Sequence, residues 1–151
     1  MRTPGRRAAT VAALLLVPAC TQFLGPTRTA EDYELKAAST ADSVLSAVQT
    51  ARLVVTAADH DKAFGTYVSV ALADAEVDAG GAAATFARLQ PPDRASDALR
   101  DELTDLTDEA SATLADLRIT ARRGDLDALA RRAEPLAGIA RDLSAFSERH
   151  G

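Results

Sequence analysis

The spacing of apolar residues after residue 29 predicts long amphipathic helices. The first is expected from about Ala30 to Ala58, with Thr29 as its N-cap. Its apolar positions are separated alternately by four and three residues: Ala37, Ala41, Val44, Val48, Ala51, Val55 and Ala58. This 3.5-residue repeat is typical of helices that pack nearly parallel to one another.

A second helix is expected from Lys62 to Leu89, after a turn at Asp59-His60-Asp61. Gly80-Gly81 interrupts it, and we interpret the pair as a close helix contact or a gentle bend rather than a break. Gln90-Pro91-Pro92 ends the helix, because proline disfavours helical geometry in the residue before it. The predicted buried stripe is Phe64, Val68, Leu72, Ala75, Ala79, Ala82, Phe86 and Leu89.

The third helix is expected from Arg94 to Arg123, with Asp93 as N-cap and Gly124 as a left-handed C-terminal cap. Its predicted buried face is Leu99, Leu103, Leu106, Ala110, Leu114, Leu117 and Ala121.

The fourth helix is expected from Leu126 to about Arg149, capped by Asp125. Pro135 lies inside it and should kink or split it near Glu134. Its predicted stripe is Leu126, Leu129, Ala133, Leu136, Ala140, Leu143 and Phe146.

These four helices and their short connections predict an all-α fold, an up-down-up-down antiparallel four-helix bundle over residues 30–151. Helices of roughly 28 residues would be about 42 Å long. The alternative is a pair of long hairpins that dimerise to complete the bundle.

The N-terminal residues differ from the rest of the chain. Three arginines, Arg2, Arg6 and Arg7, precede an apolar run at residues 8–17. A run of about ten residues suits a signal peptide and is too short to span a bilayer, which takes about 20. Arg6-Arg7 is also a twin arginine, so both the general secretory and the twin-arginine export routes stay open.

Val17-Pro18-Ala19-Cys20 ends this segment and resembles the lipobox of bacterial lipoproteins. The resemblance covers residues 1–20 only, with valine where leucine is commoner and an unusual proline before the alanine. It implies a diacylglyceryl group on the Cys20 sulfur and cleavage between Ala19 and Cys20. The alternatives are an ordinary secretory signal with a chance cysteine, or a buried N-terminal helix.

Three regions are therefore expected: a signal peptide at residues 1–19, a lipidated cysteine with a flexible tether at residues 20–29, and the helical bundle. Cys20 is the only cysteine of the chain, so no intramolecular disulfide can form. Two acyl chains on its sulfur would give stable membrane residence.

Charge and composition narrow the possible partners. Without residues 1–19 the chain has 14 basic and 22 acidic residues, which gives a net charge of −8. An acidic surface repels nucleic acid and anionic lipid headgroups, so nucleic acid is not an expected partner.

One group of basic residues is a candidate partner surface. The turn between the third and fourth helices should lie at the end of the bundle far from the tether. The arginines expected there could meet an anionic partner, or could offset helix dipoles and pair with Asp59, Asp61, Asp125 and Asp127. They are Arg118, Arg122, Arg123, Arg131 and Arg132.

No motif predicts catalysis, a metal or a cofactor. The aspartates Asp97, Asp101, Asp105 and Asp108 share one face of the third helix, where a solvated surface is the simpler interpretation than a calcium site. The only histidines are His60 and His150, and no Glu-x-x-His pair or nucleophile motif occurs.

The sequence therefore predicts a non-enzymatic binding or accessory module. It would be lipid-anchored to the cell membrane on the extracytoplasmic side, with a possible protein partner in the cell envelope, as a monomer or homodimer. The alternative is a small-ligand or metal carrier with a pocket between helices, which Gly80-Gly81 and Pro135 could open.

Overall fold

The computed structural model describes residues 29–151, and these residues form an all-α fold without strands. The signal peptide, the lipobox with Ala19 and Cys20, and all of the tether except Thr29 lie outside the described residues. Five helices follow one another: α1 (Ala30–Asp59), α2 (Gly65–Ala87), α3 (Arg94–Arg122), α4 (Leu126–Arg132) and α5 (Leu136–His150). Among them, none is both long and apolar enough to cross a membrane.

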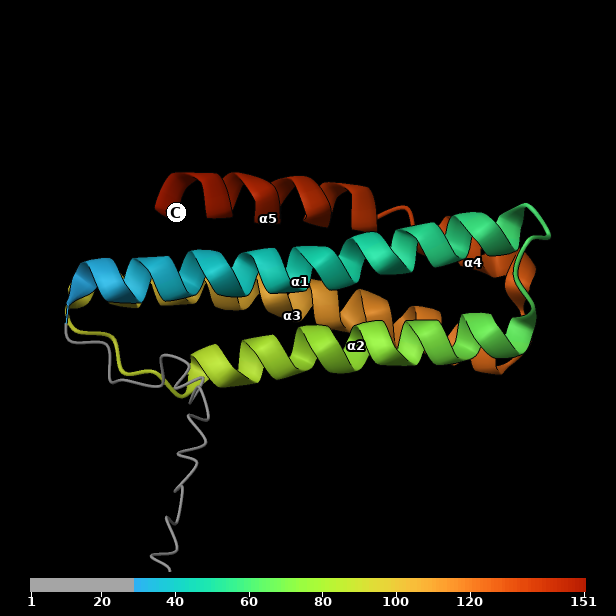
Figure 1. Cartoon of the computed structure of the whole chain (residues 1–151), viewed down its shortest axis with the longest axis horizontal. Coiled ribbons are helices and arrows are strands. Elements are labelled where there is room, and N and C mark those ends of the chain that lie inside the picture. The colour runs from blue at the N-terminus through green and yellow to red at the C-terminus, as the bar shows by residue number, and fades with distance from the viewer. Residues whose placement is uncertain (1–28) are drawn as a thin grey trace, which may run out of the picture.

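The helices lie side by side, with α1 in the centre of the packing (Figure 1). Helix α1 packs against α2, α3, α4 and α5, and α2 packs against α3. The α1–α2 connection lies at the same end of the molecule as α4, opposite the start of α1 (Figure 1). The C-terminus lies beside the first half of α1. A Cβ built on Gly151 would be 3.7 Å from the Cβ of Ala38 in that helix.

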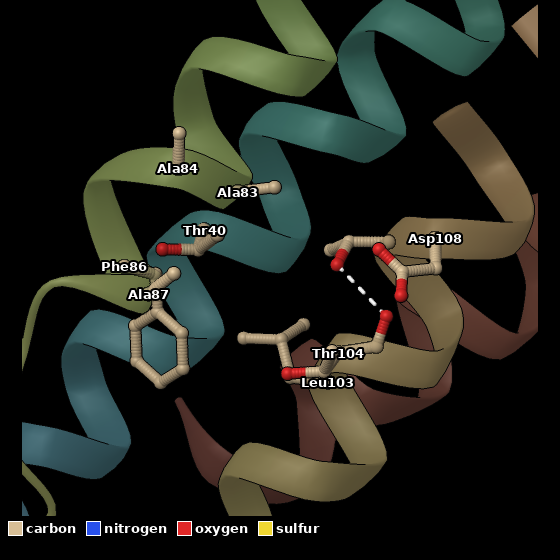
Figure 2. A pocket seen from close by; sticks show the side chains of 9 residues that line it. Thr40, Ala83, Ala84, Phe86, Ala87, Leu103, Thr104 and Asp108 are labelled. Atoms are coloured by element: carbon tan, nitrogen blue, oxygen red, sulfur yellow. Dashed lines mark hydrogen bonds between the residues drawn. The ribbon is translucent and has the colours of Figure 1, made fainter. Parts of the chain in front are cut away.

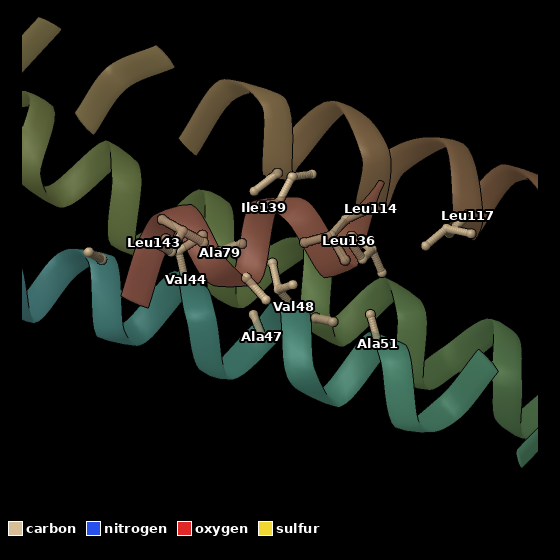
Figure 3. Packing of buried hydrophobic residues seen from close by; sticks show 14 of the residues in the cluster. Val44, Ala47, Val48, Ala51, Ala79, Leu114, Leu117, Leu136, Ile139 and Leu143 are labelled. Carbon is tan, nitrogen blue, oxygen red and sulfur yellow. The ribbon is translucent and has the colours of Figure 1, made fainter. Parts of the chain in front are cut away.

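The predicted seam of α1 is confirmed, since all seven of its residues are buried. Thr29 caps this helix by accepting a hydrogen bond from the Asp32 backbone N–H at 3.0 Å. Valine side chains of the seam meet leucine and isoleucine side chains of α3 and α5 (Figure 3). This cluster joins all three helices, so one core holds the described residues together.

Helix α2 differs from its prediction at its start. It begins at Gly65 rather than Lys62, because residues 60–64 form a longer connection in which Asp61 has a positive φ of 55°. Phe64 is the N-cap and is 88% exposed, so its placement on the buried stripe was wrong. A residue before the helix does not follow the helical period of the residues after it.

Of the two alternatives for Gly80-Gly81, a close helix contact or a gentle bend, the close contact is not found. Helix α2 continues through both glycines, as expected. A Cβ on either residue would meet nothing within 4 Å, so no neighbouring helix within residues 29–151 requires a glycine there. The predicted close contact is therefore not the reason for these residues.

The caps of α3 are confirmed. Asp93 accepts a hydrogen bond from the Ser96 backbone N–H at 2.8 Å, and Gly124 has a φ of 74°, in the left-handed region that favours glycine. Its predicted face is buried, apart from a partly buried Leu106.

The expected fourth helix is divided into α4 and α5 at Pro135, which lies at the N-cap of α5. Because proline has no N–H to donate, the helical hydrogen-bond pattern is replaced by turns around it. Asp125 is the N-cap residue of α4, but its side chain accepts no capping hydrogen bond.

Candidate partner-binding surface

The five arginines predicted as a partner surface lie on the last turns of α3, on the connection after it and at the end of α4. Two of them form ion pairs. Arg118 of α3 donates to the Glu76 carboxylate of α2, and Arg132 of α4 donates to both oxygens of Asp116 at 2.7 and 2.8 Å. Both pairs join different helices, so these two arginines serve the packing of the molecule.

The pairs also change the acidity of the arginines. The hydrogen bond and the charge of Glu76 raise the pKa of Arg118, and those of Asp116 raise the pKa of Arg132. Both guanidinium groups therefore stay charged over the whole physiological range, and their charge is already matched by a carboxylate.

The other three arginines, Arg122, Arg123 and Arg131, are exposed and form no ion pair within residues 29–151. Arg131 donates to the backbone carbonyl of Asp127 at 3.4 Å within its own helix. Arg122 lines an open hollow of about 400 Å³ between the start of α2 and the end of α3.

The carboxylates that pair with these arginines are not the expected ones. Asp59, Asp61, Asp125 and Asp127 were expected, whereas Glu76 and Asp116 are the partners found. The expected carboxylates are either close to the arginines in the sequence or lie in the α1–α2 turn, which was expected at the same end of the bundle. The observed partners lie one or more turns inside a helix, where only the three-dimensional packing of the helices brings them to the arginines.

A second surface, which the sequence analysis missed, lies on the outward side of α2. Large apolar side chains gather there: Tyr67 is 60% exposed, Val70 56% and Val77 71%. Helix α2 packs mainly against α1 and α3, and near its start Leu126 of α4 lies 3.8 Å from a Cβ built on Gly65. The signal was present in the sequence, because Val70, Val77 and Ala84 recur every seven residues outside the predicted buried stripe.

Ile119 of α3 is another exposed apolar residue. It is 37% exposed and directly follows Arg118, whose side chain reaches Glu76 on α2. Several large exposed apolar residues on one helix favour a contact with a partner, whereas single exposed apolar residues need no explanation.

A hollow of about 200 Å³ lies between α1, α2 and α3 (Figure 2). Alanines of α2 and Leu103 of α3 form its apolar part, and Thr40, Thr107 and Asp108 supply polar groups. The hydroxyls of Thr40 and Thr107 already donate to carbonyls of their own helices, at 2.8 and 3.0 Å. Asp108 is therefore the charged group that this hollow offers to a ligand.

A further hollow of about 240 Å³ lies where α4 and α5 divide, against α1. It is lined by Ala133, Glu134 and Ala137 on one side and by Arg52 and Asp59 among others on the other. The expectation that Pro135 could open a gap thus has a structural counterpart, although a shallow one.

The acidic residues of α3 lie on its solvent-exposed side, where Asp97, Asp101, Asp105 and Asp108 are all exposed. Within residues 29–151, no group of three or more His, Cys, Asp or Glu side chains is arranged to hold a metal ion. His60 is exposed in the α1–α2 connection, and the His150 ring packs at a tilt against the Phe146 ring, with centroids 4.7 Å apart.

Comparison of the chain with known protein families, with curated proteins and with solved structures finds no match.

Proposed function

We propose that this protein is a lipid-anchored binding module on the extracytoplasmic side of the cell membrane, and that it acts by docking a protein partner rather than by catalysis. The observation that carries this proposal is the exposed apolar side of α2. Tyr67, Val70 and Val77 are exposed on α2, which within residues 29–151 packs mainly against α1 and α3. Such a surface loses apolar exposure when a partner covers it, which favours association.

The anchor in this proposal is Cys20. The lipobox resemblance of residues 17–20 supports a diacylglyceryl group on its sulfur and cleavage of the chain between Ala19 and Cys20. The start of α1 would then face the membrane, and the α1–α2 connection and α4 would lie at the far end. Arg122 and Arg123, which lie near that end, are a second possible contact for an anionic group on a partner.

The proposal includes the architecture that presents this surface. We propose an up-down-up-down four-helix bundle in which α4 and α5 together form the fourth helix. The packing of α1 against α2 and α5, and of α2 against α3, supports it. In this arrangement, α2 has two neighbours and one free side.

The anchor is tested by mass spectrometry of the full protein, extracted in mild detergent from the membranes of its own cells. The expected result is a chain that starts at Cys20 and carries a diacylglyceryl adduct. A matched Cys20→Ser variant should leave the membrane fraction. An unmodified chain cleaved at another position would overturn the membrane anchor.

A small-ligand carrier is the second candidate, because of the hollow between α1, α2 and α3 (Figure 2). Its volume of about 200 Å³ is enough for only a small molecule. A thermal shift with small amphiphilic probes that disappears in Ala83→Leu, which would fill the hollow, would support this function. No shift with any probe in the parent protein would count against it.

A further inference from the structure

The second half of α2 contains a glycine that the packing of the described residues does not explain. A glycine inside a helix lowers the stability of that helix relative to alanine, because its backbone loses more freedom on folding. Gly81 is exposed, and nothing within residues 29–151 lies within 4 Å of a Cβ built on it. The distance between two packed helices depends on the side chains at their contact, so a second helix can come close at this residue.

Two opposite charges lie at equal distances on either side of Gly81. Asp74 is seven residues before it, and Arg88, the C-cap residue of α2, is seven residues after it. Seven residues make almost two helical turns, so both lie on the same side of α2 as Gly81, each about 10 Å from it along the axis. Both are exposed, and neither forms an ion pair within residues 29–151.

This spacing makes the surface complementary to a second copy of itself. When two α2 helices lie antiparallel, with Asp74 of each opposite Arg88 of the other, the residue midway between them, Gly81, faces Gly81 of the copy. A two-fold axis then passes between the two glycines, and the ion pair occurs twice. A large side chain on this axis would collide with its own copy, whereas glycine lets the backbones approach. In a parallel pair the two Asp74 carboxylates would face each other, so charge selects the antiparallel arrangement.

The residues around Gly81 fit such a contact. Val77 is 71% exposed and would lie opposite Thr85 of the copy. The Thr85 hydroxyl already donates to the Gly81 carbonyl at 2.7 Å, so covering it does not remove its hydrogen bond. Ala84, which also borders the hollow in Figure 2, is small. Asp78 is three residues from Gly81 and lies about 60° around the helix, at the edge of the contact, where water still reaches it.

We propose that the protein forms a symmetric homodimer through the second half of α2, with Gly81 at the two-fold axis and an Asp74–Arg88 ion pair on each side of it. This inference rests on the proposed binding role of α2 and names a second copy as the partner of this half. The start of α2, with Phe64 and Tyr67, lies beyond the end of the copy's α2. The dimer therefore leaves that part of the surface for a protein of another kind.

The contact is small, so its occupancy depends on the membrane anchor. From Asp74 to Arg88 it is about 21 Å long. The net charge of −8 without residues 1–19 opposes association of copies that are free in solution. Two copies confined to one membrane meet at a higher effective concentration. In the dimer the two starts of α1 lie at opposite ends, so the pair lies along the membrane with both anchors in it.

The test is disulfide crosslinking of the full-length protein in its own membranes. Gly81→Cys places a thiol at the two-fold axis, and Leu53→Cys on α1, at a position that is 71% exposed, is the matched control. After mild oxidation, position 81 should give about tenfold more disulfide-linked dimer than position 53, because random collisions rarely meet the geometry of a disulfide. Cys20 is the only other cysteine, so the parent protein measures any crosslink through it.

Charge exchange tests whether the partner is a second copy. With cysteine at position 81, Asp74→Arg and Arg88→Asp should each lower the dimer yield by about tenfold, because like charges then face each other. The double variant restores opposite charges and should return the yield to within about twofold of Gly81→Cys alone. Asp142→Arg, at an exposed position of α5, is the control and should change the yield by less than about twofold. Contact between two copies predicts this rescue, whereas a different protein would still meet a changed α2.

The outcomes separate this inference from the proposed function. A dimer yield at position 81 no higher than at position 53, or a double variant as weak as the single ones, would overturn the homodimer. If Cys20 carries its lipid and position 81 gives no dimer, the anchored module stands without this contact. If Cys20 is unmodified, the membrane anchor fails, and the disulfide at position 81 still decides whether the dimer forms.

Discussion

At the scale of single residues, Tyr33 stands out because its side chain is fully buried and its hydroxyl has no hydrogen-bond partner within residues 29–151. Its ring packs against Phe86, with centroids 5.0 Å apart, so the apolar part of the side chain is well placed. Burial raises the pKa of Tyr33, which keeps the hydroxyl neutral. The unpaired hydroxyl lowers the stability of the fold, because its bonds to water are lost and not replaced.

We expect Tyr33→Phe to stabilise the protein by about 1 kcal/mol, since it keeps the ring and removes the unpaired hydroxyl. The measurement is the free energy of unfolding in urea. Tyr67→Phe is the matched control: that ring is 60% exposed and its hydroxyl can bind water, so no change is expected. A loss of stability in Tyr33→Phe would mean that the buried hydroxyl has a partner, such as an ordered water molecule.

Two glycines of opposite conformation give a second prediction. Gly80 is inside α2, where a Cβ would meet nothing within 4 Å, so Gly80→Ala should stabilise the protein by about 0.5–1 kcal/mol. Gly124 has a φ of 74°, so Gly124→Ala should destabilise it by about 1 kcal/mol. Thermal unfolding of both variants measures the contrast. A destabilised Gly80→Ala protein would show that a neighbour occupies the space above α2.

At the scale of helices, the caps at Thr29, Asp93 and Gly124 and the seam of α1 could be predicted from the sequence, because each depends on residues close together in the chain. Phe64 could not be placed correctly, since its position depends on how the chain turns after α1. The partners of Arg118 and Arg132 could not be predicted either. Glu76 is 42 residues from Arg118, and the packing of α2 against α3 brings the two together.

The outward side of α2 shows a different limit of sequence reasoning. Its residues were visible, but a helix with apolar positions on two sides does not reveal which side faces the core. The larger side chains Leu72 and Phe86 are buried on the inner side, whereas Tyr67 and Val77 are exposed. Which side is covered depends on where α1 and α3 lie, and only the packed structure gives that.

The cap of α3 predicts a dependence on pH. The hydrogen bond from the Ser96 N–H lowers the pKa of Asp93 below its ordinary value of 3.8. A carboxyl whose pKa is lower in the folded protein stabilises the fold above its unfolded pKa, and this contribution is lost as the pH falls through the folded value.

We therefore expect Asp93→Asn, which can still accept the hydrogen bond but does not ionise, to lose less stability than the parent protein below about pH 4. The measurement compares the thermal midpoints of both proteins from neutral to acid pH. Asp142→Asn, at an exposed position of α5, is the control. Equal acid sensitivity of the parent and Asp93→Asn would show that the charge of Asp93 does not contribute to the cap.

At the scale of the whole molecule, the break at Pro135 raises the question of whether α5 belongs to the same cooperative unit as α1, α2 and α3. Helix α5 has only 15 residues, and a helix of that length is marginal on its own in water. It is held by its buried side, where Leu143 lies beside Val44 of α1 (Figure 3). Arg149 also donates to Glu102 of α3, although that pair is half exposed and contributes little.

If α5 shares the core, Leu143→Ala should lower the free energy of unfolding by about 3 kcal/mol, since it removes buried methyl groups and leaves a cavity. The whole protein should still unfold in one transition. Leu53→Ala, at a position that is 71% exposed, should change stability by less than about 0.5 kcal/mol. If Leu143→Ala instead produced a separate early transition, α5 would be an independently detaching element. In that case the side of α1 that α5 now covers would become exposed and apolar. The exposed side of α2 would then no longer be the main candidate for binding a partner.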